Sequence, residues 1–280
     1  MRVFLIIFTV LILTGAQVCA GNGIPERVVS LSPIITETIF LLGAQDRLIA
    51  DTTYCNTPEA AKLKEKIGSV TRMNIEKILS LQPDLVIGGP MSPEDQLMTL
   101  EHRPIEVLRI QNPKTFSEMC DLTLRIGLKL GREAAAIQIT AQVRKEVEGL
   151  YAKVRDLPKP KVFFQLGTNP LHAVNRNKFM NEYIRYGGGV NITGNDLSGI
   201  CGLERVVAGN PDIILISLMG TSQKAAEAEK EKWMELRHLT AAKQNRIFVV
   251  DPEMICSPTP SSFASGLRYL LPLIHPEAMP

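Results

Sequence analysis

The stretch NIEKILSLQPDLVI, from Asn74 to Ile87, returns in a second version as GLERVVAGNPDIIL, from Gly202 to Leu215. In both versions a Glu follows an apolar residue, a short apolar run comes next, and Pro-Asp leads into a strand of buried type. The Glu stands seven residues before the Pro each time. A unit repeated in this way indicates a chain built from two similar halves.

Predicted strands alternate with predicted helices around each copy. In the first half, strands are expected at residues 27–32, 47–53, 85–89 and 105–110, with helices at 35–43, up to 66 and from 93. In the second half, strands are expected at residues 161–167, 212–217 and 246–251, with helices at 179–186, through 233 and from 261. This alternation is typical of an α/β fold with a mostly parallel sheet covered on both faces.

The alternation stops between residues 115 and 157, where no strand is predicted. Apolar residues there recur at spacings of four and three, which gives one helical stripe: Ile139, Val143, Val147, Leu150, Val154 and Leu157. A helix from near Arg132 would have about 25 residues and a length of roughly 38 Å. An ordinary surface helix would show the same stripe, but the length and the central position favour a rigid connector.

We therefore expect two Rossmann-like lobes with a ligand cleft between them. The N-terminal lobe is assigned to residues 21–114, a helical connector with the long interlobe helix to 115–157, and the C-terminal lobe to 158–280.

Residues 1–20 are typical of a cleaved secretory signal peptide. A basic Arg2 precedes an apolar run too short to span a bilayer, and VCA at residues 18–20 places the cut after Ala20. A lipid anchor on Cys19 is the alternative, but such signals place a small residue before the Cys, where this chain has Val18. We expect a soluble periplasmic protein.

Composition narrows the classes of partner. The 280 residues are 45% hydrophobic with a net charge of +2, and basic clusters are interleaved with acids, so nucleic acid is not an expected partner. The mature chain keeps Cys55, Cys120, Cys201 and Cys256. An even set in an oxidising compartment favours one or two disulfides, and no pair has the short spacing of a zinc site.

Ligands of open α/β sheets bind beyond the carboxyl ends of the strands. The candidate ligand-binding residues lie on the loops predicted there: Pro33, Tyr54, Val70, Thr71, Arg72, Met91, Asn169, His172, Ser198 and Asp251. Cys201 and Cys256 also fall on such loops of the second lobe, so they are the leading disulfide pair.

Several stretches together resemble one known family. The signal peptide, RVVSLSPIITETIFLLGA, TYCNTPEAA, MNIEKILSLQPDLVIGG and QLGTNPL look like an ABC-transporter substrate-binding protein of the class whose lobes are joined by one long helix. The resemblance extends from about Arg27 to the last helix. It implies that the protein binds cobalamin, a ferric siderophore or haem in the cleft and delivers it to a membrane permease.

QLGTNPL and Tyr54 are most similar to the cobalamin-binding members. Those proteins tend to place tryptophans where this chain has Val70, Gly89 and Ser198, and a Phe-like residue where it has His172. The single Trp233 lies in a charged helix away from the predicted cleft loops.

Individual candidates have competing interpretations. His172 could be an axial ligand to the iron or cobalt of a bound chelate, or a hydrogen-bonded loop histidine. Arg72 could pair with a ligand carboxylate or phosphate, or be solvated. Tyr54 could stack on the ligand or donate a hydrogen bond to it.

Glu76 and Glu204 are each predicted in the first turn of a short helix. A carboxylate there complements the helix dipole by roughly 0.3–1 kcal/mol, which explains either residue alone. The family resemblance implies a further role, because the matching glutamates sit at the tips of the two lobes and dock onto arginines of the permease. We favour docking over the helix-dipole interpretation.

The expected function is thus binding by a monomer, without catalytic group, resident metal or cofactor. An exported hydrolase or chelatase-like enzyme is the competing class, although no G-x-S-x-G or H-E-x-x-H motif occurs. A zinc- or manganese-binding relative would need several convergent ligands, and His172 with Asp251 is the only start.

Overall fold

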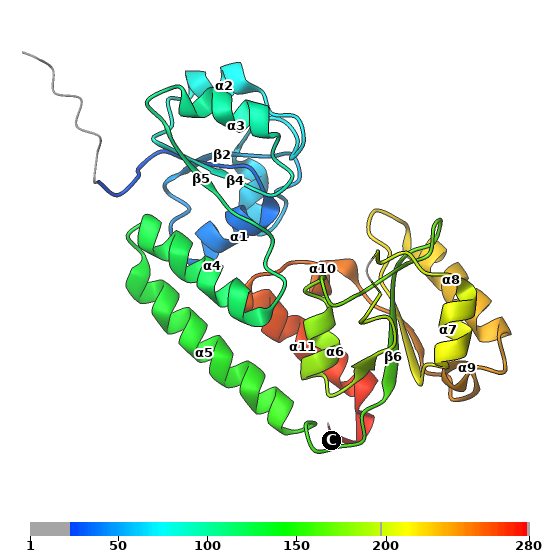
Figure 1. The fold of residues 1–280 in the computed structure, drawn as a ribbon. Helices are drawn as coiled ribbons and strands as arrows, with labels where there is room; N and C mark the ends of the chain where they lie inside the picture. The colour runs from blue at the N-terminus through cyan, green and yellow to red at the C-terminus, as the bar shows by residue number, and fades with distance from the viewer. Residues whose placement is uncertain (1–22, 197, 279–280) are drawn as a thin grey trace, which may run out of the picture.

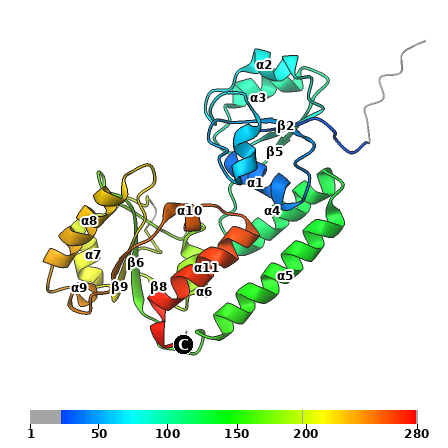
Figure 2. The same cartoon turned by 180° about the vertical axis from the view of Figure 1, so that it is seen from behind.

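The computed structural model describes residues 23–196 and 198–278, in which two α/β lobes are joined by a layer of helices (Figures 1 and 2). The predicted signal peptide and Cys19 lie outside the described residues. No helix in the described ranges combines the length and the apolar character needed to cross a membrane.

The first lobe contains a five-stranded parallel sheet in the order β3-β2-β1-β4-β5. Its strands are β1 (Val28–Ser30), β2 (Leu48–Asp51), β3 (Glu65–Lys66), β4 (Leu85–Gly88) and β5 (Glu106–Arg109). One face packs on α1 (Pro33–Leu41) and the other on α2 (Ile75–Ser80) and α3 (Glu94–Glu101). Alternate residues of each strand enter the two core clusters, as a sheet covered on both faces requires.

The helix predicted up to Lys66 is wrong. The segment forms a short 3-10 helix, η1 (Glu59–Leu63), and then strand β3, which pairs with β2 through Ala50 to Glu65 and Asp51 to Lys66. Helix-forming composition was overridden here by a tertiary pairing, because Lys66 forms an ion pair with the buried Asp51.

The second lobe has the sheet order β10-β9-β6-β7, with β8 also paired to β6. Its strands are β6 (Lys161–Gly167), β7 (His172–Ala173), β8 (Val190–Asn191), β9 (Ile213–Ile216) and β10 (Ile247–Val249). Its helices are α6 (Asn181–Tyr186), α7 (Leu203–Gly209), α8 (Gln223–Glu235), α9 (Thr240–Lys243), α10 (Pro252–Ile255) and α11 (Pro260–Ile274), followed by η2 (Pro276–Ala278). Only β7 runs antiparallel to its neighbour, so the predicted mostly parallel sheets are confirmed.

The repeated unit forms α2 and β4 in the first lobe, and α7 and β9 in the second. The Asp of the repeated unit accepts backbone hydrogen bonds in both lobes. The Asp84 carboxylate accepts hydrogen bonds from the backbone N–H groups of Glu26 and Arg27, just before β1. The Asp212 carboxylate accepts one from Lys161 N–H at the start of β6. The Pro-Asp of the repeat therefore ties each sheet together and is structural.

The connector differs from the single long helix that was predicted. Two antiparallel helices, α4 (Phe116–Lys129) and α5 (Glu133–Ala152), both run between the lobes. Phe116 packs in the second-lobe core and Leu130 in the first, and α5 returns with Ala136 in the first and Leu150 in the second. The helix α5 has 20 residues rather than 25, because turns begin after Ala152 and Pro158 follows. With α11 packed against both, the connector is a braced helical layer.

Candidate functional site

A cleft of about 830 Å³ lies between the lobes. The first-lobe wall is formed by loops that follow strand ends: Leu31 to Ile34, Tyr54, Val70, Thr71, Pro90 and Met91. The base is Asn112 to Lys114, between β5 and α4. The second-lobe wall consists of Leu166, Asn177 to Met180, Met219, Cys256 and Pro258. The lining is mostly apolar, and its volume suits a large organic ligand.

Three apolar side chains stand exposed in this cleft. Tyr54 and Met91 of the first wall are each 60% exposed, and Met219 of the second wall is 63% exposed. Because water solvates such side chains poorly, a ligand with flat apolar faces would remove their surface from water.

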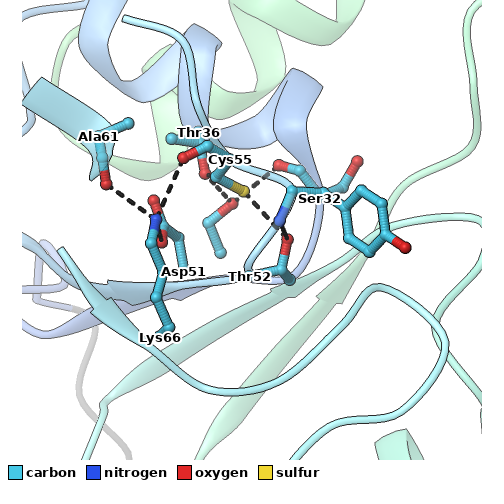
Figure 3. A network of polar contacts seen from close by, with 9 residues as sticks. Ser32, Thr36, Asp51, Thr52, Cys55, Ala61 and Lys66 are labelled. Atoms are coloured by element: carbon cyan, nitrogen blue, oxygen red, sulfur yellow. Dashed lines mark hydrogen bonds and ion pairs between the residues drawn. The ribbon is translucent and has the colours of Figure 1, made fainter. Parts of the chain in front are cut away.

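A buried polar network fixes the loop that carries Tyr54 (Figure 3). Lys66 Nζ donates hydrogen bonds to Asp51 Oδ1 at 2.6 Å, to the Ala61 carbonyl at 3.0 Å and to the Cys55 carbonyl at 3.1 Å. One ammonium group therefore ties the end of β2 to two points of the 52–63 loop. Asp51 is fully buried, and this burial raises its pKa while Lys66 opposes the rise.

The Cys55 thiol belongs to the same network. Its sulfur lies 3.2 Å from both Thr36 Oγ1 and Thr52 Oγ1, and it is fully buried. Burial raises the pKa of this thiol, so it stays protonated at neutral pH. Cys55 thus packs the Tyr54 loop against α1 as a small hydrogen-bonding group.

A direct contact joins the two lobes at the inner end of the cleft. Ser257, between the lining residues Cys256 and Pro258, donates a hydrogen bond to the Glu37 carboxylate of α1. Burial raises the pKa of Glu37, and the Ser257 hydroxyl partly opposes the rise. This bond ties the first-lobe helix to the segment that precedes α11.

The structure brings five of the sequence-predicted ligand-binding residues into one lining: Pro33, Tyr54, Val70, Thr71 and Met91. The other five lie outside it. Arg72 is exposed beside Thr71, and Asn169 is exposed in the turn between β6 and β7. Asp251 caps α10, accepting a hydrogen bond from Glu253 N–H at 2.9 Å.

His172 and Ser198 lie close together, away from the lining. His172 is the exposed first residue of β7 and forms a bridge with Ile200, while the Ser198 hydroxyl donates to the Ile200 carbonyl at 3.1 Å. Within residues 23–196 and 198–278, no three His, Cys, Asp or Glu side chains gather as a metal site.

Sequence reasoning missed Asn112, Lys114, Asn177, Lys178 and Met219 as lining residues. The Asn112-Pro113 turn follows the carboxyl end of β5 and could have been found by the rule that located the other loops. Phe179 could not, because it falls within residues 179–186, which were predicted as helix, whereas α6 begins at Asn181.

The predicted disulfide between Cys201 and Cys256 is wrong, since all four cysteines of the described ranges are free thiols. Cys256 packs in the cluster that contains Phe164 and Leu215, and Cys201 in the cluster that contains Phe163 and Ile214. Neighbouring residues of a strand face opposite sides, so the sheet separates the two thiols. Burial raises the pKa of Cys256 to about 11.

Glu76 and Glu204 occupy matching places. Each lies in the first turn of its helix, α2 or α7, and each is exposed. Among the described residues, neither carboxylate forms an ion pair or hydrogen bond, whereas the Asp of each repeat is fully engaged.

Known proteins share both the sequence and the fold. The family model described as periplasmic binding protein matches residues 28–254. A vitamin B12-binding protein of Vibrio vulnificus is 28% identical over 238 residues, which is 84% of this chain and 85% of that protein. An uncharacterised ABC transporter substrate-binding lipoprotein of Bacillus subtilis, YvrC, is 29% identical over 262 residues, covering 90% of this chain and 81% of that protein.

Solved structures give the same architecture. The periplasmic haem-binding protein HutB of Vibrio cholerae superposes with a TM-score of 0.80 at 22% identity, over 90% of this chain and 99% of that one. The vitamin B12-binding protein BtuF of Vibrio cholerae gives 0.77 at 22% identity, over 92% and 99%. These likenesses support the fold. Together with the family match over most of its length, they establish that the chain belongs to the periplasmic binding protein family.

Proposed function

We propose that this protein is the exported substrate-binding component of an ABC importer, which captures a metal-chelate nutrient between its lobes and delivers it to a membrane permease. The observation that carries the proposal is the interlobe cleft, with apolar walls built from loops at the carboxyl ends of both sheets. The protein acts by binding, as a periplasmic monomer, with its signal peptide removed. The lipoprotein name of YvrC keeps a lipid anchor as the alternative.

Within the metal chelates we favour a corrinoid. Relatives named vitamin B12-binding protein match over most of this chain. The exposed Tyr54, Met91 and Met219 offer apolar surface to a macrocycle. Haem and ferric siderophores are the alternative ligands, since the same walls would accept another flat or rounded chelate.

A thermal-shift panel tests this ligand class. The mature protein is melted with cyanocobalamin, dicyanocobinamide, haemin and several ferric siderophores. A ligand present at 100 times its dissociation constant should add about 2.7 kcal/mol of stability. If no member of the panel raises the melting temperature, the metal-chelate proposal fails.

The paired glutamates are proposed to dock the permease. One unpaired carboxylate on each lobe would set the orientation of the complex by charge complementarity. Glu76→Ala with Glu204→Ala should leave ligand affinity unchanged and reduce uptake with the cognate permease by about tenfold or more. Glu148→Ala, an exposed Glu of α5, is the matched control. Normal uptake by the double variant would return both residues to a helix-dipole role.

A further inference from the structure

The charged groups of the cleft lie on its base and on its second-lobe wall. Among its lining residues only Lys114 and Lys178 carry charge, and both are basic. Lys114 lies at the base, in the loop before α4, and Lys178 lies on the second-lobe wall, in the loop before α6. The first-lobe wall contributes no charged side chain.

Both lysines are exposed and have no counter-ion in the described part of the chain. The Glu118 carboxylate accepts a hydrogen bond from the backbone N–H of Lys114 at 2.6 Å and forms no ion pair with its ammonium group. Five other lysines, Lys62, Lys66, Lys77, Lys129 and Lys232, each pair with a carboxylate, whereas Lys114 and Lys178 combine the lack of a carboxylate partner with a place on the cleft lining. Two unpaired cations beside low-dielectric walls favour the approach of an anion.

Amide side chains accompany the lysines. Asn112 stands two residues before Lys114, and Asn177 immediately precedes Lys178; both line the cleft. Ammonium and amide N–H groups are the donors that carboxylates and phosphates accept. We call Asn112, Lys114, Asn177 and Lys178 the basic edge.

We propose that the basic edge is a subsite for an anionic substituent, a carboxylate or a phosphate, of the chelate whose apolar body fills the cleft. This inference rests on the proposed function and adds the charge of the ligand to it. The segments that carry the two lysines meet, because the Phe116 N–H at the start of α4 donates a hydrogen bond to the Glu182 carboxylate of α6. One anion would therefore contact both lysines and fix the ligand's orientation in the cleft.

Binding of three probes to the Lys114→Met/Lys178→Met variant tests the subsite. Haemin offers carboxylates, cyanocobalamin offers a phosphodiester, and dicyanocobinamide has a corrin ring but lacks that phosphodiester. Titrations at low and high NaCl are compared with wild type and with Lys145→Met, an exposed lysine of α5 outside the cleft. Both lysines are exposed, so the variant should melt as the wild type does.

The expected result is that the double variant weakens an anionic probe by about tenfold or more and flattens its salt dependence. Lys145→Met should have no effect, and any binding of dicyanocobinamide should be unchanged. Loss confined to haemin identifies carboxylate recognition, and loss confined to cyanocobalamin identifies phosphate recognition. Wild-type affinity of the double variant for whichever of haemin and cyanocobalamin binds would overturn the subsite and leave the proposed function standing. Failure of wild type to bind these three probes and every ferric siderophore of the thermal-shift panel would instead refute the proposed function, and the subsite with it.

Discussion

The two walls of the cleft differ in where their buried polar groups lie. In the first lobe, Lys66 and Asp51 lie directly beneath the loop that carries Tyr54. In the second lobe, Gln165 donates to Glu229 at 2.8 Å and accepts from Trp233 at 2.7 Å, in the cluster on the sheet face away from Cys256.

This difference indicates which wall already has its binding shape before the ligand arrives. Buried hydrogen bonds that share one donor group hold the segments that they connect. In the first lobe the network holds a loop that lines the cleft. In the second lobe it holds side chains of the core on the sheet face away from Cys256. We infer that the Tyr54 wall is preorganised for the ligand, and that the second wall receives its shape from packing.

Breaking the first-lobe ion pair should have the largest effect. Lys66→Met leaves the buried Asp51 carboxylate without a partner and should lower the free energy of unfolding by about 3 kcal/mol. Lys232→Met is the matched change in the second lobe, where the lysine is 70% exposed, and should have an effect of at most about 1 kcal/mol. Urea denaturation followed by circular dichroism measures both. Equal losses would remove the distinction between the walls.

A second substitution sharpens this prediction. Replacing both partners, as Asp51→Leu/Lys66→Met, should recover much of the lost stability, because no unpaired buried charge remains. If the double variant is as unstable as Lys66→Met, the loss comes from the loop contacts to Ala61 and Cys55 rather than from the charge.

Tyr54→Ala should affect binding rather than folding. The side chain is 60% exposed, so the melting temperature should hardly change, while affinity for a ligand found by the thermal-shift panel should fall about tenfold. Met98→Ala, 48% exposed on α3 and outside the cleft, is the control. If Lys66 acts on the ligand through Tyr54, Lys66→Met should weaken binding in wild type but add little in the Tyr54→Ala background.

The interlobe hydrogen bond should give the smallest effect, visible as a pH dependence. Burial raises the pKa of Glu37 above its ordinary 4.5, so the ionised form costs stability once the pH rises through the raised value. Glu37→Gln cannot ionise, and its amide oxygen can still accept from Ser257. At pH 8 it should melt about 2 °C above wild type, with the gap closing toward pH 4. A gap that is constant across this range would show that Glu37 ionisation does not influence folding.

Local pattern predicted the longer strands of both lobes well, because buried parallel strands such as Ile213–Ile216 are continuous apolar runs. The local pattern did not predict the strands that form by pairing with another segment of the chain. Strand β3 exists because Lys66 reaches Asp51, and β7 because His172 folds back on Gly167. Each of these strands has only two residues, which is too short for a periodic pattern to show.

The candidate site was predictable to the extent that it follows topology. Pro33, Tyr54 and Met91 all lie after strands, and the structure brings them into one cleft. Lys114 follows strand β5, so the same topological rule would have found it, whereas Lys178 was missed because the fold of the segment before α6 brings it to the cleft. The disulfide prediction failed because sequence placed Cys201 and Cys256 on loops without showing that a sheet lies between them.

Protection of Cys256 tests most directly the claim that ligand occupies the interlobe cleft. In Cys201→Ser protein, Cys55 and Cys120 are fully buried, which leaves Cys256 as the cleft thiol. Its modification rate by methyl methanethiosulfonate is measured at pH 8.5, with peptide mass spectrometry to identify the site. A ligand that raises the melting temperature, present at 100 times its dissociation constant, should slow the reaction by about 100-fold, because roughly 1% of the protein stays free. An unchanged rate in the presence of that ligand would contradict binding in the cleft.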